Sequence, residues 1–359
     1  MKIVTTVGTS LITNQLKDNE VKKLYEVLKQ KDFSEKKMFE LEYKNLKEVL
    51  TKKIFLNEKA SAEIKSIIKL KDSFADKSFE VELIATDSLL SPICAELLKS
   101  LLEKSNIKVN FNKNNIIEDL QVSDYAKYKK GLINLLNRLN QIGNNGVYFD
   151  NLILNITGGF KGIIPYLTIF SQVNNIPLYY IFEFTGTLIK VPQIPIKIDE
   201  VVFDKYWKEF YNLNKNDTLD KSDLSFDFLR ENDNLLEIEE SFVSFNALGK
   251  ILWNKYETTH FIFYADDNIF NEIEKQNDIK RILSSKFKAN VLSKTETKGE
   301  HLVYDDGNNS NRIFYFEKNN EYFIYKTFQN HDLYEKYINS NTIDKESFIK
   351  SAKRRKFSI

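Results

Sequence analysis

The sequence predicts a chain of mixed α/β class, with an open α/β domain over residues 1–199, a helical connector over residues 200–245 and an α+β domain over residues 246–359. Three observations predict this division. Short β-branched apolar runs alternate with helical patterns through the first region, which is typical of a parallel sheet covered by helices. The pattern then weakens in an acidic stretch over residues 204–240. Beyond that stretch, two apolar strand patterns separated by four polar residues predict a β-hairpin.

The first region consists of short apolar runs followed by turn residues and then by helical patterns. The predicted strands are residues 3–7, 79–86, 151–156 and 177–182, the predicted helices are residues 89–103, 123–141 and a segment through residues 170–173, and residues 183–195 predict a closing hairpin. Asp87 and Ser88 are placed to cap the helix that follows them.

The third region predicts helices on either side of a small sheet. The predicted elements are helix 245–256, strand 260–264, helix 268–287, a polar basic stretch 292–303, strands 311–317 and 322–328, and a final amphipathic helix 344–356. Phe348, Ile349 and Ala352 should face inward from this last helix.

Length and composition indicate a globular protein of more than one domain. The 359 residues exceed the size at which one hydrophobic core stops growing, about 250–300 residues. The chain has a single cysteine, Cys94, which excludes an internal disulfide and is compatible with a reducing compartment. We expect Cys94 to be a small core residue. No apolar run is long enough for a membrane helix, and the start does not resemble a signal peptide. We therefore expect a cytoplasmic protein without a membrane partner.

The charges are balanced overall and uneven locally. The net charge of +1 predicts no global attraction to nucleic acid. Residues 345–359 carry six Lys or Arg against one Glu, which predicts a local basic surface. Three histidines and one cysteine argue against a zinc site, and we expect no metal and no cofactor.

Two glycine-containing turns are candidates for anion binding. VGTS at residues 7–10 and NITGGFKG at residues 155–162 each follow a strand and open a helix. Glycine allows close approach of a phosphate to the backbone, hydroxyls add hydrogen bonds, and Lys161 supplies a cation. Neither turn is a dinucleotide fingerprint or a Walker A loop. The simpler alternative is that these glycines only cap helices.

These turns give the first region a family resemblance. The segments VGTSLITN and LNITGGFKG, and more loosely IIEDLQVSDYAKYKKGLINLLNRL, resemble the CARF domain of CRISPR-associated sensors. The resemblance implies a Rossmann-like domain that forms a homodimer and binds a cyclic oligoadenylate across the two-fold axis, with cyclic tetra-adenylate the commonest ligand of this class. By position it implies these ligand-binding residues: Gly8, Thr9, Ser10, Asn14, Thr86, Asp87, Ser88, Thr157, Gly158, Gly159 and Lys161.

Two types of nuclease make specific demands on the sequence of the third region. A HEPN ribonuclease requires an Arg a few residues before a His, and no histidine here has one. A metal-dependent nuclease requires an Asp and a Glu-x-Lys on neighbouring strands. Glu296, Thr297 and Lys298 supply the tripeptide, with Asp266 or Asp267 upstream, so this alternative stays open.

The favoured interpretation is an RNA-cleaving domain. The strand, long helix, hairpin and basic tail of the third region resemble RelE and HigB-like mRNA interferases, although Gln329-Asn330-His331 stands where that family often has two lysines. The resemblance implies a metal-independent endoribonuclease that attacks mRNA on the ribosome. The implied catalytic residues are Arg312 and Lys326 at the phosphate, His331 or Tyr334 in proton transfer, and Lys294 and Lys298 as helpers; the implied RNA-binding residues are Lys353, Arg354, Arg355 and Lys356.

Each assignment has a simpler rival. Arg312 could ion-pair at a sheet edge, Lys326 could face solvent, and Tyr334 and Tyr337 could pack in the core. A ligand-responsive transcription regulator is a further alternative, because residues 235–252 could contain a small winged-helix element. The connector shows no recognition helix rich in Arg, Asn or Gln, which that alternative requires.

Overall fold

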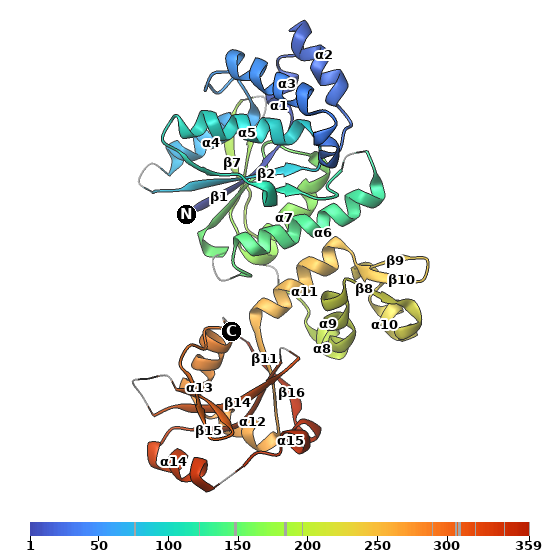
Figure 1. Cartoon of the computed structure of the whole chain (residues 1–359). Helices are drawn as coiled ribbons and strands as arrows, with labels where there is room; N and C mark the ends of the chain where they lie inside the picture. The colour runs from blue at the N-terminus through green and yellow to red at the C-terminus, as the bar shows by residue number, and fades with distance from the viewer. Residues whose placement is uncertain are drawn as a thin grey trace. The chain divides into compact units, whose positions relative to one another are not determined.

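The protein folds into two compact units, Met1–Lys255 and Tyr256–Ile359 (Figure 1). The computed structural model describes residues 1–74, 77–121, 123–146, 149–182, 185–195, 197–288, 290–305, 307, 310–319, 321–340 and 342–358. The division falls inside helix α11 (Ala247–Thr259), later than the junction predicted near residue 245. Residues 200–245 belong to the first unit.

The first unit is built on a parallel sheet. Its strands are β1 (Lys2–Val7), β2 (Glu80–Thr86), β3 (Lys108–Asn110), β4 (Ile116–Ile117), β5 (Leu152–Asn155), β6 (Leu178–Phe182) and β7 (Thr187–Lys190). The order is β3-β2-β1-β5-β6-β7, with β4 also paired to β2, and all pairs are parallel except β6 with β7. The predicted α/β class and its strands are confirmed. Glu183 of the predicted hairpin lies outside the described residues.

Helices cover both faces of this sheet. Before β2 come α1 (Ser10–Thr13), α2 (Asn19–Leu28), α3 (Glu40–Lys53) and α4 (Ala62–Ser73); after it come α5 (Leu90–Glu103), α6 (Tyr125–Ile142) and α7 (Ile164–Asn174). One core contains side chains of α2 to α5, and a second contains those of α6 and α7. In Figure 1, α4 and α5 accordingly lie above the sheet and α6 and α7 below it. Cys94 is buried in the first core, as predicted.

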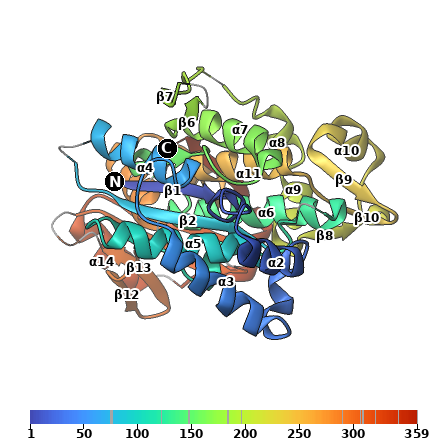
Figure 2. The ribbon, with the colours of Figure 1, turned by 90° about the horizontal axis from the view of Figure 1, so that it is seen from above.

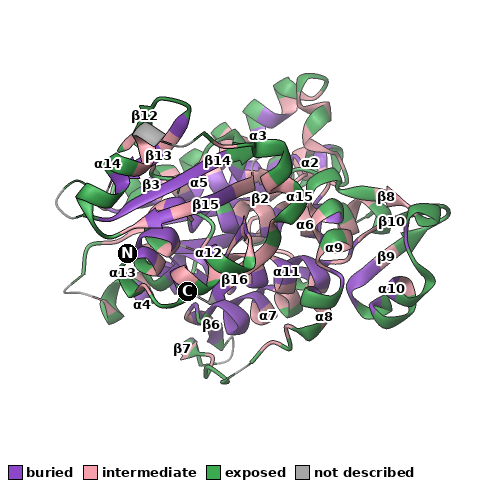
Figure 3. Cartoon of the chain, turned by 90° about the horizontal axis from the view of Figure 1, so that it is seen from below, coloured by how far each residue is buried: buried purple, intermediate pink, exposed green. Residues whose placement is uncertain are grey.

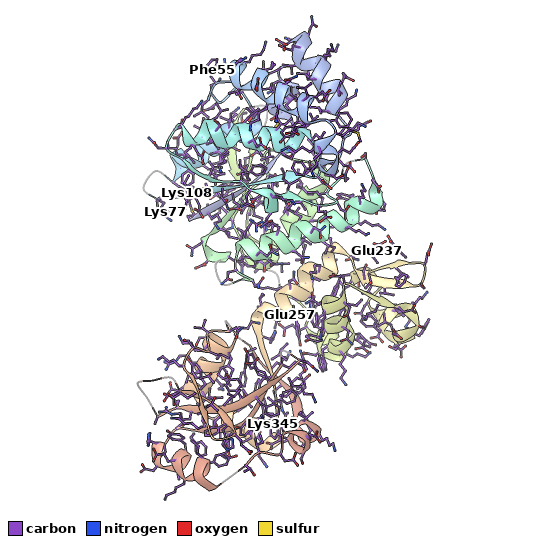
Figure 4. The ribbon with its side chains drawn as sticks, viewed as in Figure 1. Phe55, Lys77, Lys108, Glu237, Glu257 and Lys345 are labelled. Atoms are coloured by element: carbon purple, nitrogen blue, oxygen red, sulfur yellow. The ribbon has the colours of Figure 1, made fainter. Side chains whose placement is uncertain are left out.

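Residues 201–245 are more than a helical connector. They form α8 (Val201–Lys205), α9 (Trp207–Asn216), β8 (Thr218–Asp220), α10 (Phe226–Glu231), β9 (Leu236–Glu239) and β10 (Phe242–Phe245). The strands make an antiparallel sheet in the order β8-β10-β9 over an aromatic core that includes Phe210, Phe228 and Trp253. The acidic composition hid this core, because the aromatic residues are spaced among charges that face solvent. Glu237, labelled in Figure 4, projects from β9 and pairs with Lys129 of α6 at 2.9 Å.

The second unit is an α+β arrangement around a six-stranded sheet. Its strands are β11 (His260–Ala265), β12 (Thr295–Lys298), β13 (His301–Asp305), β14 (Arg312–Lys318), β15 (Glu321–Phe328) and β16 (Lys353–Ser358), in the order β12-β13-β14-β15-β11-β16. Its helices are α12 (Asp267–Glu274), α13 (Asn277–Ile282), α14 (His331–Ser340) and α15 (Lys345–Ser351). Side chains of α12 and α13 share one core with the sheet, and those of α14 and α15 share another. The central strands β14 and β15 are largely buried (Figure 3).

Two predictions for this unit need correction, whereas the hairpin of β14 and β15 is confirmed. Asn320 of the hairpin turn lies outside the described residues. The long helix 268–287 is broken into α12, α13 and a π-helical turn, Leu283–Phe287. The basic stretch 292–303 contains β12 and part of β13. The final helix ends at Ser351, and Lys353–Ser358 form a strand antiparallel to β11, because pairing with a distant strand overrides the local helical pattern.

Candidate functional site

The two predicted glycine turns meet at the carboxyl edge of the first sheet. They follow β1 and β5, which are adjacent and parallel. The Thr6 hydroxyl donates to the Gly158 carbonyl oxygen at 2.6 Å. A Cβ on Gly8 would lie 3.0 Å from the Gly159 nitrogen, and Gly159 has a φ of +97°, so both positions favour glycine. The structure therefore joins the two turns, at the edge where open α/β sheets bind ligands.

A buried carboxylate, Glu63 of α4, holds this junction together. The Gly8 amide donates to Glu63 Oε1 at 2.8 Å and the Ser10 hydroxyl donates to Oε2 at 2.6 Å. Gly158 packs on the same side chain, since a Cβ there would lie 2.2 Å from Oε1. Glu63 was not predicted, because nothing near it in the sequence indicates a contact with a turn fifty-five residues earlier. The expectation that the Gly8 amide faces a ligand is corrected: it binds Glu63 instead.

The third predicted strand end joins the same edge. Ser91 accepts a hydrogen bond from the Thr86 amide at 3.1 Å and donates to the Val7 carbonyl oxygen at 2.8 Å, which ties the end of β2 to the end of β1. Ser88 Oγ accepts from the Ser91 amide at 3.2 Å, as expected of a capping residue. The Asp87 carboxylate accepts from the Asp119 amide at 3.0 Å.

Some of the remaining predicted ligand residues have side chains that hydrogen-bond within the protein, and others are at least partly exposed to solvent. Thr157 Oγ donates to the Asn155 side chain at 2.8 Å and accepts from the Ile181 amide at 3.0 Å, so its hydroxyl shapes the turn. The Asn14 side chain donates to the Ala60 carbonyl oxygen at 3.1 Å. Thr9 is half-buried directly before α1, and Lys161 is exposed on the 3-10 turn Lys161–Ile163. Lys161 is thus an exposed cation two residues after Gly159, within the second glycine turn.

In the second unit, the structure brings together three of the predicted catalytic residues. Arg312 is buried at the start of β14, where it pairs with Asp305 of β13 at 2.9 Å and lies 5.2 Å from the centre of the Tyr334 ring. His331 packs edge-on against Tyr334 at 4.9 Å between ring centres, and its Nδ1 lies 3.7 Å from Glu335. His331 is exposed while Tyr334 is buried, so His331 is the more accessible of the two residues predicted to transfer a proton.

The predicted lysines are less closely grouped. Lys326 lies 3.4 Å from Glu272 of α12, whereas Arg312 contacts Tyr334 of α14, and these helices pack on opposite faces of the sheet. Lys326 Nζ also lies 5.7 Å from the centre of the ring of Phe328, which belongs to the same core as Tyr334, so the assignment of Lys326 and Arg312 to one phosphate stays a prediction. Lys298 pairs with Glu296 at 2.6 Å. That hydrogen bond raises the pKa of Lys298 above its ordinary 10.5, with smaller contributions from Tyr334 and Asp305.

Two further features of this unit are the predicted residue Lys294 and a contact between His301 and Tyr325 that was not predicted. Lys294 is exposed, and its Nζ would lie 2.8 Å from a Cβ placed on Gly307. His301 Nδ1 lies 2.8 Å from the Tyr325 hydroxyl, and both residues are buried. Burial raises the pKa of Tyr325. Because both side chains are buried and pack against Phe314, this pair has a packing role.

The four basic residues predicted to bind RNA lie on the edge strand β16. Lys353 pairs with Asp267 at 2.7 Å, and Arg355 pairs with the same carboxylate. The Arg354 guanidinium donates to the Tyr256 hydroxyl at 3.2 Å, and Lys356 Nζ lies 5.2 Å from the centre of the Tyr256 ring. The basic run is thus spread along a sheet edge instead of a helix end.

The residues of the metal-dependent alternative are not brought together. Asp266 caps α12 by accepting from the Ile269 amide at 2.8 Å. Three strands separate β12, which carries Glu296, from β11, which leads into Asp266 and Asp267. Four strand spacings correspond to about 19 Å, far beyond the reach of one shared metal ion. Among the described residues, no group of three or more His, Cys, Asp or Glu is placed to hold a metal.

The geometry thus defines a parallel α/β unit with a glycine-lined carboxyl edge, followed by an α+β unit with a basic edge strand. Residues 58–194 match the family model of the CRISPR-associated protein Cas_APE2256, a segment that contains Glu63 and the second glycine turn. This match supports a CRISPR-associated protein and suggests a role in CRISPR defence. A comparison with curated proteins gave no match. In the described part of the chain, every helix is too short or too polar to span a membrane.

Proposed function

We propose that the protein is a cyclic oligoadenylate-activated endoribonuclease of CRISPR defence, acting as a cytoplasmic homodimer. The observation that carries the proposal is the meeting of two glycine turns at the carboxyl edge of the first sheet, with Lys161 exposed beside them. A cyclic ligand with two-fold symmetry suits a site that a dimer duplicates. The CRISPR-associated family match over residues 58–194 supports the same assignment.

The proposed ligand site differs from a simple phosphate-binding turn. The Gly8 amide and the Ser10 hydroxyl are engaged by Glu63, so phosphate recognition falls to Lys161 and the second turn. Glu63 instead fixes the backbone of the first turn against the second. A preformed edge of this kind lowers the cost of ordering the site when a ligand binds.

For the second unit we propose metal-independent RNA cleavage on the ribosome. The ribose 2′ hydroxyl gives its proton to His331 as its oxygen bonds to the adjacent phosphorus, the bond from phosphorus to the 5′ oxygen breaks, and the 5′ oxygen receives the proton from His331. In this proposal a phosphate oxygen replaces Asp305 as a partner of Arg312, His331 transfers the proton, and the β16 cluster contacts the RNA backbone. Tyr334 contacts both Arg312 and His331.

The acidic segment after β7 disfavours the regulator alternative. The region from β8 to β10 has the sheet order of a small winged element, but its hairpin strand β9 carries Glu237 and Glu239, which pair with Lys129. Carboxylates at this position repel a DNA backbone. We therefore keep the ribonuclease as the single proposed function.

The deciding experiment is cleavage of ribosome-bound mRNA by the full chain in EDTA, with and without cyclic tetra-adenylate. The proposal expects cleavage only with the ring, and products that end in a 2′,3′-cyclic phosphate. Rings of three and six adenylates, tested in parallel, identify the activator. Cleavage that EDTA abolishes would overturn the metal-independent chemistry, and equal cleavage without any ring would overturn the sensor assignment.

A further inference from the structure

A basic groove lies on the flank of the first unit, away from the residues that form the glycine turns. It has a volume of about 850 Å³, within the usual range for small-molecule sites. Helices α3 and α5, which contact one another and lie side by side in Figure 2, form one wall. Its full lining is Phe33, Lys36, Lys47, Glu96, Lys99, Ser100, Glu103, Lys104, Phe111, Asn112, Lys113 and Ile116. Five lysines against two glutamates leave an excess of positive charge.

The charge is compensated at one end of the groove and only in part at the other, where Lys99 lies 4.0 Å from Glu103. Glu96 accepts from Tyr43 Oη at 2.9 Å, pairs with Lys47 and lies 3.8 Å from Lys36. By contrast, Lys104 and Lys113 have no ion pair within the described residues. Lysines that line a concave surface without partners attract anions, because the low-dielectric walls concentrate their field.

The length of the basic groove indicates what size of anion it can bind. Glu96 and Lys104 both belong to the stretch that ends α5, and eight residues of helix correspond to about 12 Å. A single phosphate group is too small to span that stretch, whereas a nucleotide can place its phosphates at the Lys104 end and its uncharged base at the Glu96 end. Phe33, Phe111 and Ile116 add an apolar surface on which an aromatic base can pack.

We propose that the basic groove is a binding site for a nucleoside triphosphate. The phosphates lie against Lys99, Lys104 and Lys113, and the base lies on the phenylalanine side chains. The site is independent of the proposed ring site, because none of its lining residues belongs to the turns after β1, β2 or β5. It would make the first unit responsive to a mononucleotide.

The test is a titration of the full chain with a fluorescent ATP analogue at moderate salt. Lys104→Glu combined with Lys113→Glu should weaken binding by at least about tenfold, because two attractive charges become repulsive. The matched control reverses two exposed lysines of α2, Lys22→Glu with Lys23→Glu, and should stay within about threefold of the wild type. Thermal unfolding of each variant verifies that it is folded.

Competition separates the parts of the ligand. Unlabelled ATP and tripolyphosphate should displace the analogue, adenosine should displace it poorly, and Phe111→Ala should weaken ATP more than tripolyphosphate. Lys161→Ala should bind the analogue like the wild type. The proposal is overturned if the wild type does not bind, if the groove and control variants bind equally, if only Lys161→Ala loses binding, or if a short RNA displaces the analogue and ATP does not.

Discussion

Replacing Glu63 tests how the carboxyl edge of the first sheet is held together. Glu63 accepts two hydrogen bonds, from the Gly8 amide and the Ser10 hydroxyl, while 1% exposed. Hydrogen bonds to a charged group contribute about 1.5–3 kcal/mol each, and Ser10 can partly recover its bond from water. Glu63→Ala also leaves the Gly8 amide without an acceptor and opens a void beside Gly158. We expect a loss of about 3–5 kcal/mol in the free energy of unfolding.

The isosteric change separates charge from shape. Glu63→Gln keeps one acceptor oxygen and fills the same space, so the expected loss is about 1–2 kcal/mol. Glu63→Ala should weaken ring binding by at least about tenfold, and Glu63→Gln by less than about threefold, if the role of Glu63 is to position the turn. Glu58→Ala, which removes an exposed carboxylate nearby, is the control for a change of charge.

The assay is urea unfolding followed by tryptophan fluorescence. The two tryptophans, Trp207 and Trp253, both lie in the first unit, so the signal reports on that unit alone. Cyclic tetra-adenylate binding is measured on the same preparations. The reasoning is refuted if Glu63→Ala unfolds within about 0.5 kcal/mol of the wild type, which is the usual range of a surface substitution.

Three further predictions concern the remaining charged residues. Arg312→Ala should abolish RNA cleavage and leave ring binding unchanged; full turnover in this variant would show that the proposed site is misplaced. Lys161→Ala should weaken ring binding by about tenfold without changing the unfolding transition, measured by calorimetric titration, and unchanged affinity would remove Lys161 from the site. Asp267→Asn should strengthen RNA binding, measured by filter retention, because it releases Lys353 and Arg355. Lys353 and Arg355 lower the pKa of Asp267 below its ordinary 3.8. The two ion pairs therefore persist at any pH above the lowered pKa and are lost only as the pH falls through it. The gain in RNA binding by Asp267→Asn should accordingly be the same at about pH 6 and about pH 8.

The sequence allowed most of the first sheet to be predicted, because buried parallel strands are local apolar runs such as residues 3–7 and 151–156. The glycine turns could be found for the same reason, since each directly follows a strand. Glu63 could not, because its role arises from a contact with Gly8 that only the fold creates. Local pattern also identified Arg312 and Tyr334 without indicating that Asp305 pairs with the arginine.

The second unit shows where periodicity misleads. Lys353–Ser358 has no strong strand signal of its own, and it becomes a strand because β11 offers an unpaired edge. The mixed segment over residues 201–245 was underestimated for a related reason. Its strands have three or four residues each, too few to establish an alternating pattern, and its stability depends on aromatic side chains that meet only after folding.

The pairing of β16 with β11 has a consequence for how the protein is made. β11 is the first strand of the second sheet to be synthesised and β16 is the last, so one side of β11 stays open until the strand at Lys353–Ser358 has left the ribosome. The first unit needs nothing from this strand and can fold earlier. A chain made in this order completes the edge strand that carries Lys353, Arg354, Arg355 and Lys356 only after the whole first unit has been synthesised.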